Sequence, residues 1–158
     1  MDEDIEYDSF THFEMIEITN KTLKEVFEKD SMLNNIPTDI TLDEVMEKIA
    51  VIHGLSMTIY VMRADGEEIP VVVKHKDATV QDLKQAICRQ MIRRLNRKSQ
   101  KVKVSWRFVW KSYDLVIGKQ RLKNDKTLLA DWNIKNKSRI FFVKRLKKKR
   151  NYLLEEYS

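Results

Sequence analysis

The sequence contains few of the residues that break, bridge or disorder a chain. Its 158 residues include three glycines, two prolines and one cysteine. So little glycine and proline excludes collagen-like and low-complexity chains, and the single cysteine, Cys88, permits no internal disulfide. No apolar run approaches the roughly 18 residues that a membrane-spanning helix needs, and the N-terminus MDEDIEYD does not resemble a secretory signal. We therefore expect a soluble globular protein from a reducing, intracellular compartment.

The chain also lacks the residue clusters that support catalysis. His12, His53 and His75 lie in unrelated segments without a neighbouring Cys or His at metal-ligand spacing. Cys88 lies in a predicted helix with no histidine nearby in sequence, and there is no phosphate-binding loop or dinucleotide fingerprint. A structural role is favoured for each of these residues. The sequence predicts no enzyme, no metal, no cofactor and no small-molecule substrate.

Charge is distributed unevenly along the chain. Residues 1–30 hold ten Asp or Glu and three Lys, whereas residues 74–150 hold 25 Lys or Arg and five Asp. Such a cationic body favours nucleic acid as a partner, with an anionic membrane and an acidic protein as rivals. An ordinary solvated lysine-rich surface is the simplest alternative.

The N-terminal third predicts an arm followed by helices. Residues 1–20 are acidic and weakly patterned, so we expect a flexible arm there. Apolar residues at helical spacing then predict two amphipathic helices within residues 21–54, one over 22–34 and one over 41–52. In the second helix Thr41 and Glu44 have the spacing of a capping box. The candidate partner-docking residues on these helices are Leu23, Val26, Phe27, Leu42, Val45 and Met46.

From residue 56 the apolar pattern changes to the period of a strand. The run SMTIYVMRADGEEIPVVVK predicts a β-hairpin that turns at Asp65-Gly66, a pair that tolerates positive φ. Pro70 lies in the second strand and cannot donate a ladder hydrogen bond. That strand should therefore be an edge strand or carry a bulge.

A long helix and a further strand are predicted next. Thr79 is a helix cap, and apolar residues from Val80 to Met91 recur at intervals of three and four. Residues 101–111, KVKVSWRFVWK, alternate between apolar and basic residues and predict a strand. Trp106, Phe108 and Trp110 would share its apolar face. Burial of these rings is favoured over base stacking, because the opposite face holds the cations.

This order of elements and several short motifs resemble ubiquitin. The similarity covers about residues 56–146 and includes Gly118-Lys119-Gln120, TLLADWNI at residues 127–134 with one residue inserted, and IFFVKRL at residues 140–146. It implies an α+β ubiquitin-like β-grasp, a mixed sheet packed on one main helix, here preceded by two short helices. The implied core residues are Leu128, Ile134, Ile140 and Phe142, and the strand of Pro70 is a sheet edge in that fold.

Composition, periodicity and the resemblance together predict four segments: an acidic flexible arm (1–20), two amphipathic helices (21–54), a ubiquitin-like domain (55–146) and a basic C-terminal tail (147–158). Where conjugated ubiquitin ends in Arg-Gly-Gly, this chain continues with Lys147 to Arg150. We therefore expect that it is not conjugated to other proteins.

A closer resemblance includes the flanking segment that ubiquitin lacks. The run from about Asp30 to Leu146, with IPTDITLDEVMEKIAVIHGLSMTIYV, IPVVV and VSWRFVWKSYDL, is similar to a family of ubiquitin-like subunits of the minor-spliceosome small nuclear ribonucleoprotein. The resemblance implies a nuclear, non-catalytic subunit of the particle that recognises the 5′ splice site of minor introns. Its partners would be other protein subunits and small nuclear RNA, with no membrane.

Two basic segments are candidates for RNA contact. The RNA-phosphate candidates, called the basic strip below, are Arg89, Arg93, Arg94, Arg97, Lys98, Lys101, Lys103 and Arg107. The tail residues Lys144, Arg145, Lys147, Lys148, Lys149 and Arg150 are typical of a nuclear-import signal or an RNA-binding extension. The alternative is a ubiquitin-like protein–protein adaptor with no direct RNA contact, whose basic face is only solvated.

Overall fold

The computed structural model describes residues 10–31 and 33–146. The chain divides into two compact units, Met1–Met46 and Glu47–Ser158, and each is considered by itself. Among the described residues, no helix has the length and apolar character needed to span a membrane. The basic residues Lys147 to Arg150 lie outside the described part of the chain.

The first unit is dominated by helix α1, His12–Lys29. The helix begins inside the segment predicted as a flexible arm, so that prediction is wrong for residues 12–20, and the helix predicted over 22–34 begins earlier and ends earlier. Thr11 caps it: the Glu14 N–H donates to Thr11 Oγ1 at 3.3 Å, and Glu14 Oε2 accepts from the Thr11 N–H at 2.8 Å. This reciprocal cap satisfies backbone donors that an acidic coil would leave to water.

Helix α2, Leu42–Ile52, follows the sequence prediction. The Thr41–Glu44 capping box is confirmed, since the Thr41 N–H donates to Glu44 Oε2 at 2.9 Å and the Glu44 N–H donates to Thr41 Oγ1 at 3.4 Å. The chain leaves the helix through Gly54, whose φ of 71° lies in the left-handed region. The division between the two units falls within this helix.

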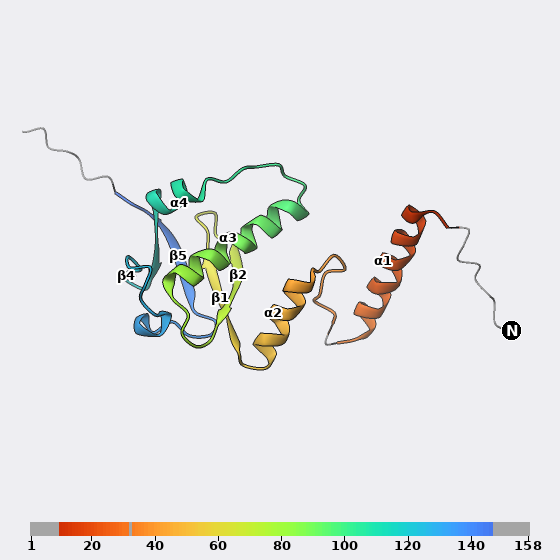
Figure 1. Cartoon of the computed structure of the whole chain (residues 1–158), viewed down its shortest axis with the longest axis horizontal. Helices are drawn as coiled ribbons and strands as arrows, with labels where there is room; N and C mark the ends of the chain where they lie inside the picture. Colours follow the sequence, from red (N-terminus) through yellow and green to blue (C-terminus); the bar gives the residue numbers. More distant parts are fainter. Residues whose placement is uncertain (1–9, 32, 147–158) are drawn as a thin grey trace, which may run out of the picture. The chain divides into compact units, whose positions relative to one another are not determined.

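The second unit is a five-stranded mixed sheet with the order β2-β1-β5-β3-β4 (Figure 1). The strands are β1 (Ser56–Met62), β2 (Glu68–Lys74), β3 (Tyr113–Ile117), β4 (Gln120–Arg121) and β5 (Arg139–Lys144). Strands β1 and β5 run parallel, and the other neighbours run antiparallel. The β1–β2 hairpin is confirmed, with Gly66 at φ 84°, and Pro70 lies on the edge strand β2 as predicted.

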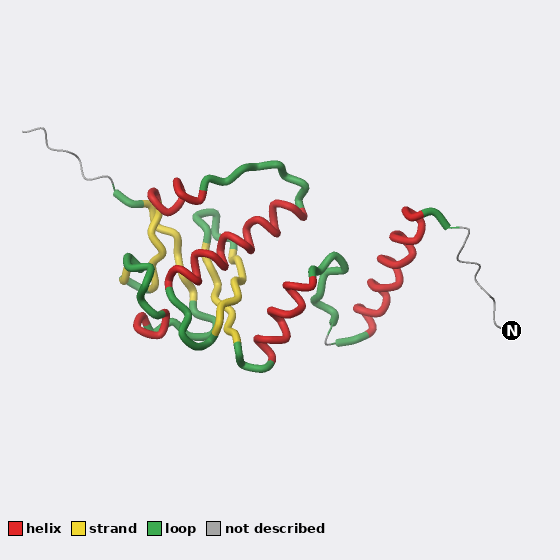
Figure 2. The backbone as a smooth tube through the Cα atoms, in the orientation of Figure 1, coloured by secondary structure: helices red, strands yellow, loops and turns green. Residues whose placement is uncertain are grey.

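Helix α3, Val80–Arg97, packs on one face of this sheet, as Figure 2 shows. Its cap is the predicted Thr79, in a capping box with Asp82. The core forms where the apolar face of α3 meets every second residue of β1 and β2. The helical spacing predicted for α3 and the alternation predicted for the hairpin are therefore both confirmed. The buried members from these elements are Met57, Ile59, Val61, Ile69, Val71, Val73, Val80, Leu83, Ala86 and Ile87.

The strand predicted over residues 101–111 is wrong. Residues 106–112 form a short helix, α4 (Trp106–Ser112), which Ser105 caps by accepting from the Phe108 N–H at 3.4 Å. A helix places Trp106 and Trp110 on one side, because they are four residues apart, and their rings stack with centroids 6.0 Å apart. Both pack against the core, whereas Phe108 is exposed. The prediction of burial therefore holds in part for the two tryptophans, which are half-buried, and is wrong for Phe108.

The segment TLLADWNI contains a 3-10 helix, η2 (Leu129–Trp132). Leu129 is 1% exposed and Leu128 is 37% exposed, so the prediction of Leu128 as the core residue is wrong by one position. The residue inserted relative to ubiquitin shifts which leucine faces inward. Ile134 and Ile140 are buried as predicted, and Phe142 is half-buried against the core.

Asp114, a buried carboxylate on β3, forms ion pairs with two arginines, one of which directly follows β5. It accepts from Arg121 Nη1 at 2.8 Å and from Arg145 Nε at 2.7 Å. Burial by itself raises the pKa of Asp114, but the hydrogen bonds and charges of the two arginines outweigh it and hold the pKa below its ordinary value of 3.8. The carboxylate thus ties β3 to the residue directly after β5.

Replacing Asp114 with Asn should lower the free energy of unfolding at pH 7 by about 2 kcal/mol, because two half-exposed arginines lose a buried partner. The lowered pKa of Asp114 contributes stability that is present above about pH 4 and is lost as pH falls through the folded pKa. Urea unfolding at pH 7 and pH 3 checks this: the gap between wild type and variant should narrow in acid. A gap that is the same at both pH values would contradict it.

Candidate nucleic-acid and protein-binding surfaces

Part of the predicted basic strip is committed to ion pairs within the fold. Arg93 donates to both oxygens of Glu47, at 2.8 and 3.2 Å, and its side chain is 16% exposed. Arg94 pairs with Glu67, which lies in the turn between β1 and β2. Arg97 is not free of partners either. The ion pairs of Arg93 and Arg94 would compete with an external phosphate for the two guanidinium groups.

The remaining five cations of the strip are exposed. They are Arg89, Lys98, Lys101, Lys103 and Arg107. Within the part of the chain that the structure describes, none of the five side chains has an ion pair or hydrogen bond with another residue. Lys98, Lys101 and Lys103 lie on the loop that joins α3 to α4, and Arg107 lies in the first turn of α4. The cations therefore sit on a loop and two helices, and the predicted cationic strand face does not exist.

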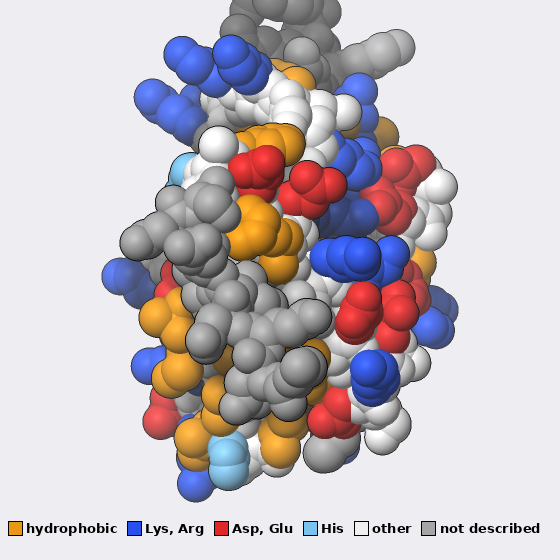
Figure 3. Space-filling view, turned by 90° about the vertical axis from the view of Figure 1, so that its right-hand side faces the viewer, with side chains coloured by type: hydrophobic (Ala, Val, Ile, Leu, Met, Phe, Trp, Pro, Cys, Tyr) orange, Lys and Arg blue, Asp and Glu red, His pale blue; other side chains and the backbone are white. Residues whose placement is uncertain are grey.

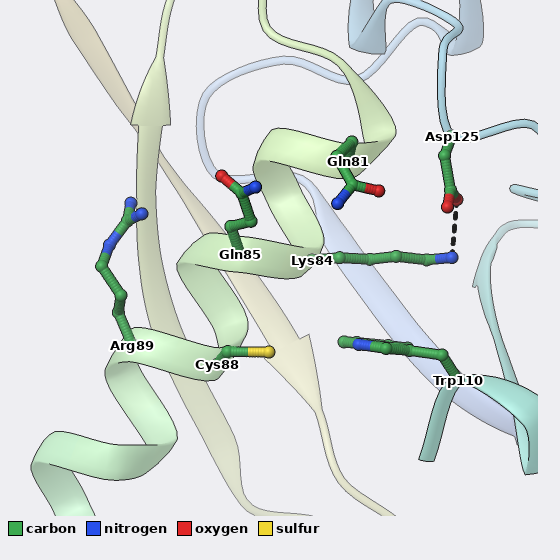
Figure 4. Close-up of a pocket in the computed structure, with 7 residues that line it drawn as sticks. All are labelled: Gln81, Lys84, Gln85, Cys88, Arg89, Trp110 and Asp125. Carbon is green, nitrogen blue, oxygen red and sulfur yellow. Dashed lines mark hydrogen bonds and ion pairs between the residues drawn. The ribbon is translucent and has the colours of Figure 1, made fainter. Parts of the chain in front are cut away.

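A shallow pocket of about 420 Å³, lined by Arg89 but by none of the other four cations, lies between α3, α4 and the loop before η2 (Figure 4). Lys84 Nζ pairs with Asp125 at 2.6 Å and lies 5.2 Å from the centroid of the Trp110 ring. Trp110 also stacks on Phe142 with centroids 5.8 Å apart. Because the ring is engaged by Lys84 and Phe142, it does not offer a bare platform for a nucleobase.

The thiol of Cys88 lines the same pocket and points toward Trp110 (Figure 4). Burial raises the pKa of this thiol, against smaller opposing effects of a hydrogen bond with Trp110 and the charge of Arg89. A raised pKa keeps the thiol protonated near neutral pH, and the thiolate is the reactive form.

We expect Cys88 to react with iodoacetamide at pH 8 several-fold more slowly than the same cysteine in urea-unfolded protein, because burial lowers its thiolate fraction. Mass spectrometry of the modified protein over time gives both rates. A folded rate equal to the unfolded rate would show that the pocket does not shield the thiol.

A second pocket, of about 480 Å³, lies between β2 and α3 and has walls of both charge signs. Lys74, Lys76 and Arg89 line it together with Glu47, Asp77 and Asp82. The molecular face in Figure 3 likewise shows acidic side chains among basic ones. In the described residues no group of three or more His, Cys, Asp or Glu is placed to hold a metal ion.

The predicted docking residues are unevenly exposed. Val26, Leu42 and Met46 are exposed, while Leu23, Phe27 and Val45 are half-buried. The sequence reasoning missed Phe13, Met15 and Ile16, which are exposed on α1. The signal was present, because Phe13 and Ile16 continue the spacing of Leu23 and Phe27 toward the N-terminus, but the acidic composition obscured it.

The tail candidates are only partly described. Lys144 is exposed at the end of β5, and Arg145 is held by Asp114. The rest of the tail lies outside the described residues. The Arg145 N–H also donates to the carbonyl of Ser112, the last residue of α4, at 2.8 Å. The start of the tail therefore lies beside α4, the helix that carries Arg107.

Comparison with known proteins decides the family. The sequence profile described as "Ubiquitin-like domain" matches residues 42–149, more than half of the chain. The chain belongs to the ubiquitin-like domain family. The match includes α2, the sheet and α3, so the predicted α+β β-grasp and the mixed sheet on one main helix are confirmed.

The chain is also similar to the "U11/U12 small nuclear ribonucleoprotein 25 kDa protein" of Arabidopsis thaliana. The two sequences are 28% identical over 137 residues, which is 85% of this chain and 82% of the relative. The similarity therefore extends beyond the ubiquitin-like domain, since a stretch of that length must include residues before α2.

Proposed function

We propose that this protein is a non-catalytic structural subunit of the minor-spliceosome small nuclear ribonucleoprotein. It acts in the nucleus and supports pre-mRNA splicing by helping the particle recognise the 5′ splice site of minor introns. The observation that carries the proposal is the similarity to the 25 kDa protein over 85% of this chain and 82% of that relative. A shared sheet alone would leave function open, because one fold serves many functions.

Protein docking is the first part of the proposed role. The ubiquitin-like unit buries its own core, and α1 and α2 have no buried residue. Their exposed apolar side chains, including Val26, Leu42 and Met46, suit contacts with other protein subunits of the particle. Half-buried Leu23, Phe27 and Val45 extend the same surfaces.

RNA contact is the second part. The five unpaired cations of the basic strip can bind phosphates of small nuclear RNA, which gives affinity without reading the base sequence. Arg93 and Arg94 lie next to this group in sequence and hold α3 through their ion pairs with Glu47 and Glu67. The tail from Lys144 to Arg150 contributes nuclear import or a further RNA contact, as short basic runs do.

The alternative is a protein adaptor that reaches the particle without touching RNA. Its support is the same pair of apolar helices together with the mixed charge of the β2–α3 pocket. Purification of the tagged full chain from nuclear extract, with and without nuclease, separates the two. We expect small nuclear RNA and particle proteins to copurify, and ultraviolet irradiation to cross-link the chain to RNA. Copurification without cross-linking favours the adaptor, and absence of particle components contradicts both.

A further inference from the structure

Helix α1 has two chemically distinct sides. At 3.6 residues per turn, its apolar side chains other than Ile18 fall within roughly half of the circumference, and its charged side chains fall on the other half. We name the apolar half the α1 face; it consists of Phe13, Met15, Ile16, Leu23, Val26 and Phe27. The helix contains no buried residue, and Phe13 is 74% exposed. This side of the helix is therefore largely uncovered in the isolated chain.

Thr19 lies among the residues of the α1 face and Thr22 lies at its border, and the hydroxyl of each has a hydrogen-bond acceptor within the helix. The Thr19 hydroxyl donates to the Met15 carbonyl at 2.7 Å, and the Thr22 hydroxyl donates to the Ile18 carbonyl at 2.9 Å. A partner can cover these side chains without leaving an unpaired hydroxyl, which would cost free energy if it were buried alone. The face can thus be desolvated along its length.

Charge on the same segment indicates what can cover it. Residues 1–20 contain seven Asp or Glu and no Lys or Arg, and two of these carboxylates, Glu14 and Glu17, lie in the first turns of α1. RNA is disfavoured as an occupant because its phosphates would be repelled. A protein groove with an apolar floor and Lys or Arg at the end that receives the helix N-terminus is complementary to both properties.

We propose that the N-terminal half of the α1 face docks into a groove of this chemistry on a protein subunit of the particle. This inference rests on the proposed function and adds the residues and the partner chemistry of one interface. Apolar contacts from Phe13 and Ile16 supply the affinity, and Glu17 sets the salt dependence.

Ile16 and Ile18 provide a matched pair for the test. They are 45% and 48% exposed, belong to the same helix and have the same side chain, but Ile18 lies outside the α1 face. Ile16→Ser and Ile18→Ser therefore cost similar helix propensity. Glu17 and Glu25 form a second pair, because Glu25 lies in the C-terminal half and farther from the face.

The experiment measures how much tagged full-length chain cosediments with the minor-spliceosome particle in nuclear extract, at several salt concentrations. We expect Ile16→Ser to reduce the bound fraction at limiting particle by about tenfold, and Ile18→Ser to change it less than about twofold. Glu17→Lys should weaken binding most at low salt, and Glu25→Lys should have little effect. Circular dichroism of each variant confirms that α1 still forms.

Four other outcomes would overturn the proposed docking surface, and each identifies a different reason. If wild type does not cosediment, the proposed function fails together with the docking surface. If wild type cosediments and the two isoleucine variants behave alike, only the docking surface fails. If Ile16→Ser, unlike Ile18→Ser, lowers the ultraviolet cross-linking of the chain to RNA, RNA is the occupant. If the purified chain sediments as a dimer that Ile16→Ser dissociates, the occupant is a second copy.

Discussion

Leu129→Ala is expected to lower the free energy of unfolding by about 3 kcal/mol, whereas Leu128→Ala should lower it by less than about 1 kcal/mol. Leu129 is 1% exposed within the core, and its truncation leaves a cavity that the surrounding sheet and helix cannot fill. Leu128 is 37% exposed and loses little apolar contact. Urea unfolding monitored by circular dichroism measures both values on the same scale.

The comparison is informative because the two leucines are adjacent and chemically identical. Both variants lose the same atoms, and alanine suits the backbone at either position. A larger loss for Leu128→Ala would restore the alignment that the ubiquitin resemblance implied and would contradict the described turn. Equal losses of unfolding free energy in the two variants would contradict the conclusion that Leu129, and not Leu128, is the core residue.

The elements that the sequence predicted correctly are those with strong local signals. The hairpin turns at Asp65-Gly66 because a glycine is available for the positive φ, which Gly66 adopts at 84°. Helix α3 begins where Thr79 and Asp82 can cap each other. The placement of Pro70 on an edge strand also required no tertiary information, because a missing N–H is tolerated only there.

The errors arise where one pattern fits two periods. In the segment from Trp106 to Trp110 the apolar residues satisfy alternation, and they equally satisfy the helical spacing of three and four. Packing of the two tryptophans against each other and the core favours the helix, and that packing depends on Phe142, more than thirty residues away. Local sequence could not decide it.

The candidate RNA surface could be predicted only as a set of cations. Composition identified all eight members of the basic strip, but it could not show which of them have acidic partners. Arg93 pairs with Glu47 and Arg94 with Glu67, both distant in sequence. Folding thus divides the strip into arginines that hold the structure and cations that remain available.

That division changes which substitutions report on RNA binding. Removing Arg93 or Arg94 breaks a partly buried ion pair, so a loss of binding would be confounded by a loss of stability. The available cations avoid this problem because they are exposed. We therefore expect the combined Lys98→Gln, Lys101→Gln, Lys103→Gln and Arg107→Gln variant to keep the melting temperature of the wild type within a few degrees.

The same variant should weaken binding to unrelated single-stranded RNAs and reduce the slope of log affinity against log salt by about 0.7 for each phosphate contact that is lost. The matched control replaces Lys119, Lys123, Lys126 and Lys137 with Gln, which removes the same charge from exposed positions outside the strip. Its slope should stay near the wild-type value, because only contacts, and not net charge, release bound counterions. Fluorescence anisotropy over a salt series measures all three proteins. If the control variant loses as much slope as the strip variant, RNA binding depends on the overall positive charge of the protein and not on the strip. If the strip variant keeps the wild-type affinity and slope, the adaptor without RNA contact is favoured.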